Sequence, residues 1–123
     1  MSAPGEDTPR FDISALVRNF GDDSEVLESI LQIFLEEAPQ RAAAIRQGVR
    51  DGDHDAVKRA AHSLANTTGT LEAERALLLA RATEEAARSA DHALVTERAA
   101  LLLDEVERIL SQIRGYRGSE SDS

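Results

Sequence analysis

Apolar residues recur at helical spacing along almost the whole chain, in blocks that short polar turns separate. The turns, rich in glycine, aspartate, serine and threonine, lie at residues 21–24, 51–53, 67–70 and 89–91. No block alternates convincingly with the period of two that is typical of a strand. The pattern therefore predicts an all-α chain with helices at about residues 12–19, 24–50, 53–67, 70–88 and 91–114.

Two of these helices carry long apolar stripes. The stripe of residues 24–50 consists of Leu27, Leu31, Phe34, Ala38, Ala42, Ile45 and Val49. The stripe of residues 91–114 has the alternating spacing of four and three that is typical of a bundle seam, and consists of Val95, Ala99, Leu102, Val106, Ile109 and Ile113. Pro39 interrupts the first stripe, which resumes in phase beyond it, so we expect a kink near residues 35–38 and not a break.

Four long helices joined by short turns are expected to form an up-down-up-down four-helix bundle. The short helix at residues 12–19 has an inner face of Ile13, Leu16 and Val17, and we expect it to cap one end. Residues 1–10 and 115–123 are small and polar, so we expect both to be disordered and residues 11–114 to form one domain.

The ends of the helices follow from residues with known capping preferences. Ser24 and Thr70 are expected to be N-caps of the second and fourth helices. Gly52 is expected to end the second helix in a left-handed conformation, and Gly115 to end the fifth.

Composition narrows the function classes. The 123 residues are 41% hydrophobic and 30% charged, as in a soluble globular protein. The chain has no cysteine, which excludes disulfides, thiolate metal sites and a cysteine nucleophile. A formal net charge of -9 argues against nucleic-acid binding. No apolar run is long enough to span a bilayer and no secretory signal is visible, so a cytoplasmic location is expected.

Several kinds of catalytic or metal site find no support. His54, His62 and His92 are the only histidines, and no two are four residues apart, so no helical metal pair is expected. His54 and His92 are interpreted as solvated surface residues. The adjacent pairs Glu36-Glu37 and Glu84-Glu85 do not share a helix face and are interpreted as solvated too. Without a glycine-rich phosphate loop, a conventional enzyme with a pocket and a cofactor is not supported.

His62 is the exception, because it lies opposite the apolar stripe of its own helix. That stripe consists of Val57, Ala60, Ala61 and Leu64. At 3.6 residues per turn, His62 points roughly 150° away from its centre. A lone histidine on a helix surface is usually incidental, so the neighbours decide its interpretation.

Four residues are expected to share the outer face with His62: Lys58 and Arg59 one turn before it, and Ala65 and Asn66 one turn after it. Two cations beside an imidazole fit a site for a phosphoryl dianion, and they disfavour the protonated ring. The alternative is an ordinary solvated face on which Lys58 and Arg59 pair with Asp55 and nearby acids.

The stretch at residues 61–73 resembles the motif of the histidine-containing phosphotransfer (HPt) domain family, approximately Ala-His-x-Leu-Lys-Gly-x-x-Gly-x-Leu-Gly-Ala. The matching residues are Ala61, His62, Leu64, Gly69, Leu71 and Ala73. Residues 34–39, with Pro39, look like the family's second helix, and the resemblance covers about residues 11–113.

This resemblance implies a phosphoryl carrier of a two-component phosphorelay, not an enzyme in its own right. His62 would accept the phosphoryl group from an aspartate of one receiver domain and pass it to another. The expected partners are the receivers of a hybrid histidine kinase and of a response regulator, which supply the Mg²⁺. The chain itself is expected to be a monomer and to need no cofactor.

Three residues depart from the motif. Ala65 stands where the family has lysine, and this removes a cation expected to steady the phosphoryl group. Asn66 stands where the family has glycine, so it partly fills the space through which a receiver approaches. Glu72 replaces the later glycine. Lys58 or Arg59 could supply part of the lost charge.

A docking surface is expected beside His62. Val26 and Ile33 lie seven residues apart, outside the core stripe of their helix, and form either an exposed apolar patch or a contact under the first helix. Glu37, Ser63 and Gly69 are expected to contact the receiver with them.

Other functions stay open at this point. The chain could be an adaptor that binds a receiver or a kinase without accepting phosphate, or a module that dimerises through the seam of its last helix. It could also be a piece of a larger hybrid kinase.

Overall fold

Five α-helices make up the regular structure of the chain. The computed structural model describes residues 4–121, and their side chains as far as Gly118. The helices are α1 (Ile13–Phe20), α2 (Ser24–Asp51), α3 (His54–Thr70), α4 (Glu74–Arg88) and α5 (His92–Ser121). The described residues contain no strand, which confirms the all-α prediction. None of these helices combines the length and the hydropathy that crossing a membrane requires.

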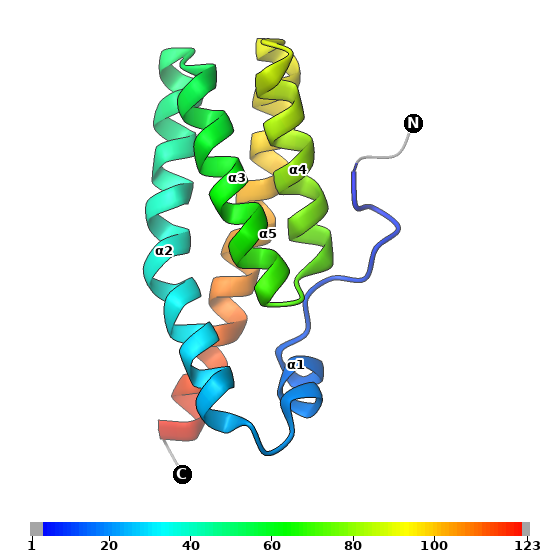
Figure 1. The fold of residues 1–123 in the computed structure, drawn as a ribbon, viewed down its shortest axis with the longest axis vertical. Coiled ribbons are helices and arrows are strands. Elements are labelled where there is room, and N and C mark those ends of the chain that lie inside the picture. The colour runs from blue at the N-terminus through cyan, green and yellow to red at the C-terminus, as the bar shows by residue number, and fades with distance from the viewer. Residues whose placement is uncertain (1–3, 122–123) are drawn as a thin grey trace.

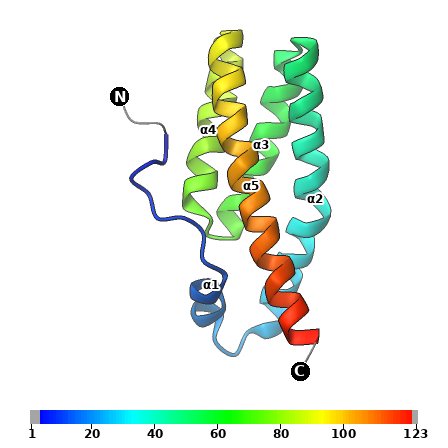
Figure 2. The same ribbon diagram turned by 180° about the vertical axis from the view of Figure 1, so that it is seen from behind.

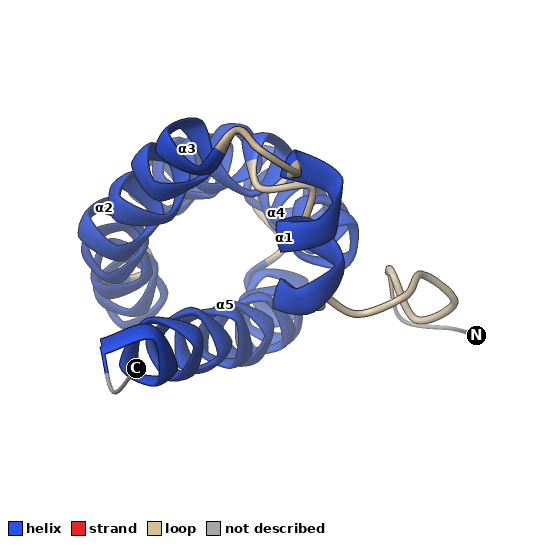
Figure 3. Ribbon diagram, turned by 90° about the horizontal axis from the view of Figure 1, so that it is seen from below, coloured by secondary structure: helices blue, strands red, loops and turns tan. Residues whose placement is uncertain are grey.

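The four long helices form the predicted up-down-up-down bundle, in which each runs antiparallel to the next (Figures 1 and 2). α2 also packs against α5, so the four helices enclose a common core when seen from below (Figure 3). α1 lies at the lower end of the bundle and contacts α2 and α5 there, as expected of a capping helix.

The two predicted stripes fill the core. Leu31, Phe34 and Ile45 of α2 are fully buried. All six residues of the α5 stripe are at most 2% exposed. Because the α5 seam is already used inside the bundle, it is not free to hold a second copy of the chain. The idea of a dimer through this seam is therefore wrong.

Two predicted N-caps are wrong. Asp23 occupies the N-cap position of α2, and Ser24 is the first helical residue. Thr70 is the last residue of α3, where its hydroxyl donates to the carbonyl of Asn66, and Ala73 precedes α4. Gly52 ends α2 in the left-handed conformation as predicted, with φ of 68°.

The ends of the chain also differ from expectation. α5 does not end at Gly115 but continues to Ser121, where the sequence predicts disorder. The guanidinium of Arg117 donates to Gln32 and Glu28, which ties this extension to α2. At the other end, Arg75 of α4 donates to the carbonyls of Thr8 and Glu6.

The remaining predictions about chain ends fall on residues 1–3 and 122–123, outside the described residues. α2 passes through Pro39 as one helix, so the expected absence of a break is confirmed. The kink near residues 35–38 stays a prediction.

Candidate functional site

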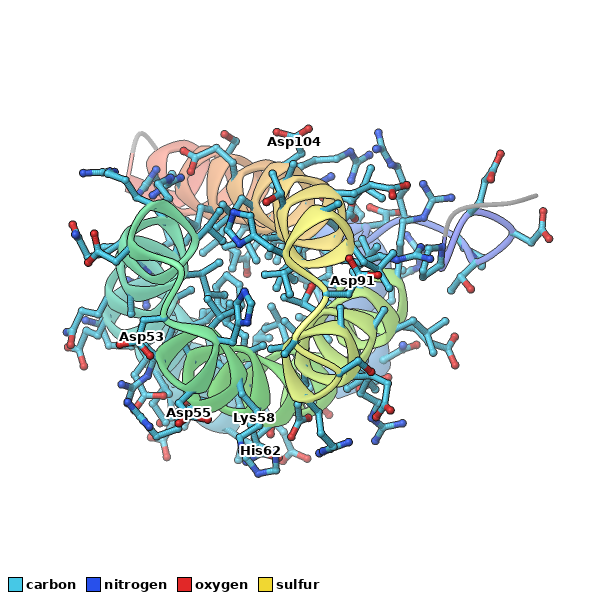
Figure 4. All side chains as sticks on the ribbon, turned by 90° about the horizontal axis from the view of Figure 1, so that it is seen from above. Asp53, Asp55, Lys58, His62, Asp91 and Asp104 are labelled. Carbon is cyan, nitrogen blue, oxygen red and sulfur yellow. The ribbon has the colours of Figure 1, made fainter. Side chains whose placement is uncertain are left out.

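His62 lies on the outer face of α3, with 63% of its side chain exposed. Ala61 and Leu64 on either side of it are fully buried, because the apolar stripe of α3 faces the core. Figure 4 shows His62 and Lys58 beside each other, both pointing away from the centre of the bundle. The outward orientation predicted from the helical periodicity is therefore confirmed.

One ring nitrogen of His62 is held by the neighbouring helix. Nδ1 lies 3.1 Å from Oε2 of Glu84 on α4. An ionised carboxylate can only accept hydrogen bonds, so this contact assigns the proton to Nδ1 when the ring is neutral. Nε2 is then the nitrogen that keeps a free lone pair. The contact thus fixes both the tautomer and the orientation of an exposed imidazole.

Glu84 is itself held in place. Only 17% of its side chain is exposed, and Nη2 of Arg88 lies 3.4 Å from the same oxygen that faces His62. The other guanidinium nitrogen of Arg88 bonds to Glu85. The interpretation of Glu84 as a solvated surface residue is therefore wrong. No spacing along the chain signals this contact, because Glu84 follows His62 by 22 residues and lies on another helix.

The cations expected beside His62 differ in their pairing. Nζ of Lys58 lies 3.9 Å from Oδ1 of Asp55, so the pairing considered as an alternative is present. Arg59 and Asn66 are exposed, as their expected place on the outer face requires.

Ala65 does not share the outer face with His62. It is only 7% exposed and belongs to the hydrophobic core. The expectation is wrong because three residues advance a helix by about 300°, which returns the side chain about 60° toward the core stripe. Position 65 lies on the flank of α3 that faces α4.

On its other flank, α3 forms a groove with α2 of about 190 Å³. Its lining consists of Ile30, Ile33, Glu37, Asn66, Thr67 and Thr70. Ile33 is 49% exposed and Val26 is 52% exposed, so the alternative in which they pack under the first helix is wrong.

The expected docking residues are only partly brought together. Ile33 and Glu37 meet Asn66 in the groove, and half-buried Ser63 lies one turn from Thr67 of its lining. Val26 is on the same helix two turns earlier, and Gly69 lies toward α4, where a Cβ would be 3.9 Å from Leu77.

The two other histidines lie at the surface, as expected, but they contact each other, which the sequence pattern does not predict. Nε2 of His54 lies 3.2 Å from Nδ1 of His92, and the rings stack with centroids 5.4 Å apart. This pair joins the first turns of α3 and α5. Across the described residues, no group of three or more histidine, cysteine, aspartate or glutamate side chains is arranged to hold a metal ion.

Comparison with known families gives one result. The family model described as Hpt domain matches residues 29–113, which include most of α2 and all of α3 and α4. Comparison with curated proteins and with solved structures gives no match.

Proposed function

Because the chain belongs to the Hpt domain family, we propose that it carries a phosphoryl group on His62 between the aspartates of two receiver domains. The observation that supports this most is the held, exposed imidazole. With Nδ1 bonded to Glu84 and 63% of the side chain exposed, His62 combines a defined orientation with access for a partner. A nucleophile that another protein must reach needs both.

The proposed transfer needs no proton to leave the ring. The lone pair of Nε2 attacks the phosphorus of an aspartyl phosphate, a nitrogen–phosphorus bond forms, and the bond from phosphorus to the aspartate oxygen breaks. The receiver aspartate leaves as a carboxylate. The ring keeps the proton on Nδ1 and becomes a phosphorylated imidazolium, whose positive charge the carboxylate of Glu84 stabilises. The reverse sequence returns the phosphoryl group to a receiver.

The partners follow from the same chemistry. We assign the donor to the receiver of a hybrid histidine kinase and the acceptor to that of a response regulator. Mg²⁺ is assigned to the receiver, where it neutralises charge on the transferring group. The chain needs no cofactor of its own in this scheme, and it meets its partners in the cytoplasm.

The groove between α2 and α3 is the proposed docking surface. Ile33 offers apolar area, and Glu37 and Asn66 surround it with polar groups. An apolar centre within a polar rim is the usual composition of a transient protein interface. Asn66 lies one turn after His62, so a receiver seated on the groove would bring its aspartate toward the imidazole.

The experiment that tests this function is phosphotransfer from a panel of phosphorylated receiver domains, with receiver binding measured in parallel. We expect acid-labile, base-stable label on the native chain and none on His62→Gln, with equal affinity for the receiver. Binding without label on the native chain would contradict the proposal. It would favour the adaptor function, with Ala65 and Asn66 as the departures responsible.

A further inference from the structure

Two of the cations close to His62 are paired with carboxylates. Lys58 faces Asp55 at 3.9 Å, and Arg88 is shared between Glu84 and Glu85. Glu84 itself places a negative charge 3.1 Å from the ring that is to carry a dianion. A transferring phosphoryl group needs compensating positive charge, which these paired residues supply only in part.

The packing of α3 on α4 brings another cation to this position. The two helices are antiparallel (Figure 1), and two contacts fix their register. His62 meets Glu84 at 3.1 Å, and a Cβ at Gly69 would meet Leu77 at 3.9 Å. Both helices advance by seven residues between these contacts. The level midway on α3, near Ala65, therefore faces the level of Arg81 on α4.

Arg81 also has the right direction and freedom. It is exposed, and no hydrogen bond or ion pair of its guanidinium occurs among the residues whose side chains are described. Leu77 and Glu84, four residues before Arg81 and three after it, both face α3, so Arg81 shares the face of α4 that is turned toward α3, at the level of Ala65. From there His62 is three residues away, or about 4.5 Å along the axis, within the reach of an arginine side chain.

We propose that Arg81 is the cation that contacts the phosphoryl group as it passes to and from His62. It acts from α4 in place of a cation at position 65 of α3, where the core-facing Ala65 has none. A guanidinium can donate two parallel hydrogen bonds to phosphoryl oxygens. This inference rests on the proposed function, since it assigns a residue to the same transfer.

The test compares Arg81→Ala with Arg114→Ala in the full chain. Arg114 is the matched control, because it is also exposed but lies on α5, away from His62. We expect Arg81→Ala to slow the maximal rate of transfer from a phosphorylated receiver about tenfold, with the receiver affinity unchanged. Arg114→Ala should leave the rate unchanged, and Arg81→Lys should recover most of the loss.

A second experiment measures phosphorylation of His62 without the docking of a receiver. Phosphoramidate, a small phosphoryl donor, is used to label His62 without a receiver. Arg81→Ala should again be slower than Arg114→Ala. Adding Ala65→Lys to Arg81→Ala should restore the rate, because it returns a cation to the other side of the site.

The outcomes separate this inference from the proposed function. Absence of label on the native chain with every donor contradicts the proposed function itself. Label on the native chain with equal rates for Arg81→Ala and Arg114→Ala contradicts the role of Arg81 alone. Loss of receiver affinity without any loss of phosphoramidate labelling also overturns it, since Arg81 would then act only in docking.

Discussion

At the scale of single residues, the chemistry of the site depends on Glu84. Its side chain is 17% exposed, and its carboxylate accepts a hydrogen bond from Nδ1 of His62 and pairs with Arg88. A carboxylate in this position both selects the tautomer and stabilises the imidazolium that forms on transfer. Glu84 is thus a positioning residue, because it acts on the phosphoryl group only through His62.

Replacing Glu84 separates these two effects. We expect Glu84→Ala to slow transfer about fivefold to tenfold, because a charge pair with an exposed partner contributes about 1 kcal/mol. Glu84→Gln keeps an acceptor for Nδ1 but loses the charge, so its transfer rate should lie between those of the native chain and of Glu84→Ala. Long-range ¹H–¹⁵N NMR should show the Nδ1–H tautomer in the native chain and a mixture in Glu84→Ala. Unchanged tautomers and rates would contradict the assignment.

Glu72 has a strained backbone conformation. Its φ is +59°, in the left-handed region, at the position where the resemblance places a glycine. A side chain there costs about 1 kcal/mol relative to glycine.

We therefore expect Glu72→Gly to raise the free energy of unfolding by about 1 kcal/mol, measured by urea denaturation. Glu97→Gly, at an exposed position within α5, is the control and should lower it by about the same amount. A loss of stability in both variants would show that the turn after α3 does not require the left-handed conformation.

At the scale of the helices, α2 and α3 approach each other closely at Gly48, near the turn that joins them. A Cβ at Gly48 would lie 2.7 Å from Cγ2 of Val57 and 3.2 Å from the carbonyl oxygen of Asp53. Val57 is fully buried and β-branched, so it cannot move aside.

Replacing two helical glycines by alanine should therefore change the free energy of unfolding in opposite directions. Gly48→Ala is expected to lower the free energy of unfolding by about 1–3 kcal/mol, as overpacking does. Gly115→Ala meets nothing within 4 Å and should raise it by up to about 1 kcal/mol through helix propensity alone. Thermal unfolding of the two variants beside the native chain measures both. Stabilisation of Gly48→Ala would mean that α2 and α3 are less closely packed.

The groove between α2 and α3 gives a prediction about binding. We expect Ile33→Glu to weaken receiver binding at least tenfold, because it places a charge at the centre of an apolar contact. Its helicity by circular dichroism should stay the same, since Ile33 is 49% exposed. Leu78→Glu, at an exposed apolar position on α4, should leave the affinity unchanged. Equal weakening in both variants, or none in Ile33→Glu, would remove the groove from the interface.

The helices and their inner faces could be predicted from the sequence because burial follows the helical period. The sequence pattern predicts a turn at residues 67–70, but α3 continues to Thr70, for a physical reason. Threonine and glycine are typical of turns, but here the hydroxyls of Thr67, Thr68 and Thr70 donate to carbonyls four residues back and the helix continues. The partnership of His62 with Glu84 could not be predicted, because periodicity assigns each residue a face but does not assign helix neighbours or their register.

At the scale of the whole molecule, His62 lies on the side of the bundle, and contacts between elements hold both ends of the bundle together. At the upper end, the contact between His54 and His92 connects the first turns of α3 and α5. The lower end is covered by α1 and by the segment before it, where the side chains of Arg108 and Gln112 both donate to the carbonyl of Phe11. The proposed receiver surface thus belongs to the middle of the bundle, where neither end needs to move for a partner to dock.

The segment before α1 also places a charge inside the protein. Glu105 of α5 is 2% exposed and faces Arg10 at 3.4 Å, while its second oxygen has no hydrogen-bond partner among the described residues. A buried carboxylate with a single partner costs stability unless that partner stays in place. The N-terminal segment is therefore part of the folded unit and belongs in any protein used to test the transfer.

The most direct test of the account is to locate the phosphate on the full chain and then follow its departure. After labelling by a phosphorylated receiver, ³¹P and long-range ¹H–¹⁵N NMR should show one phosphohistidine, on Nε2 of His62. The signal should disappear when an unphosphorylated receiver and Mg²⁺ are added, with label appearing on the receiver aspartate. Phosphate on Nδ1 or on another histidine, or a phosphohistidine that no receiver can discharge, would contradict the proposed carrier function.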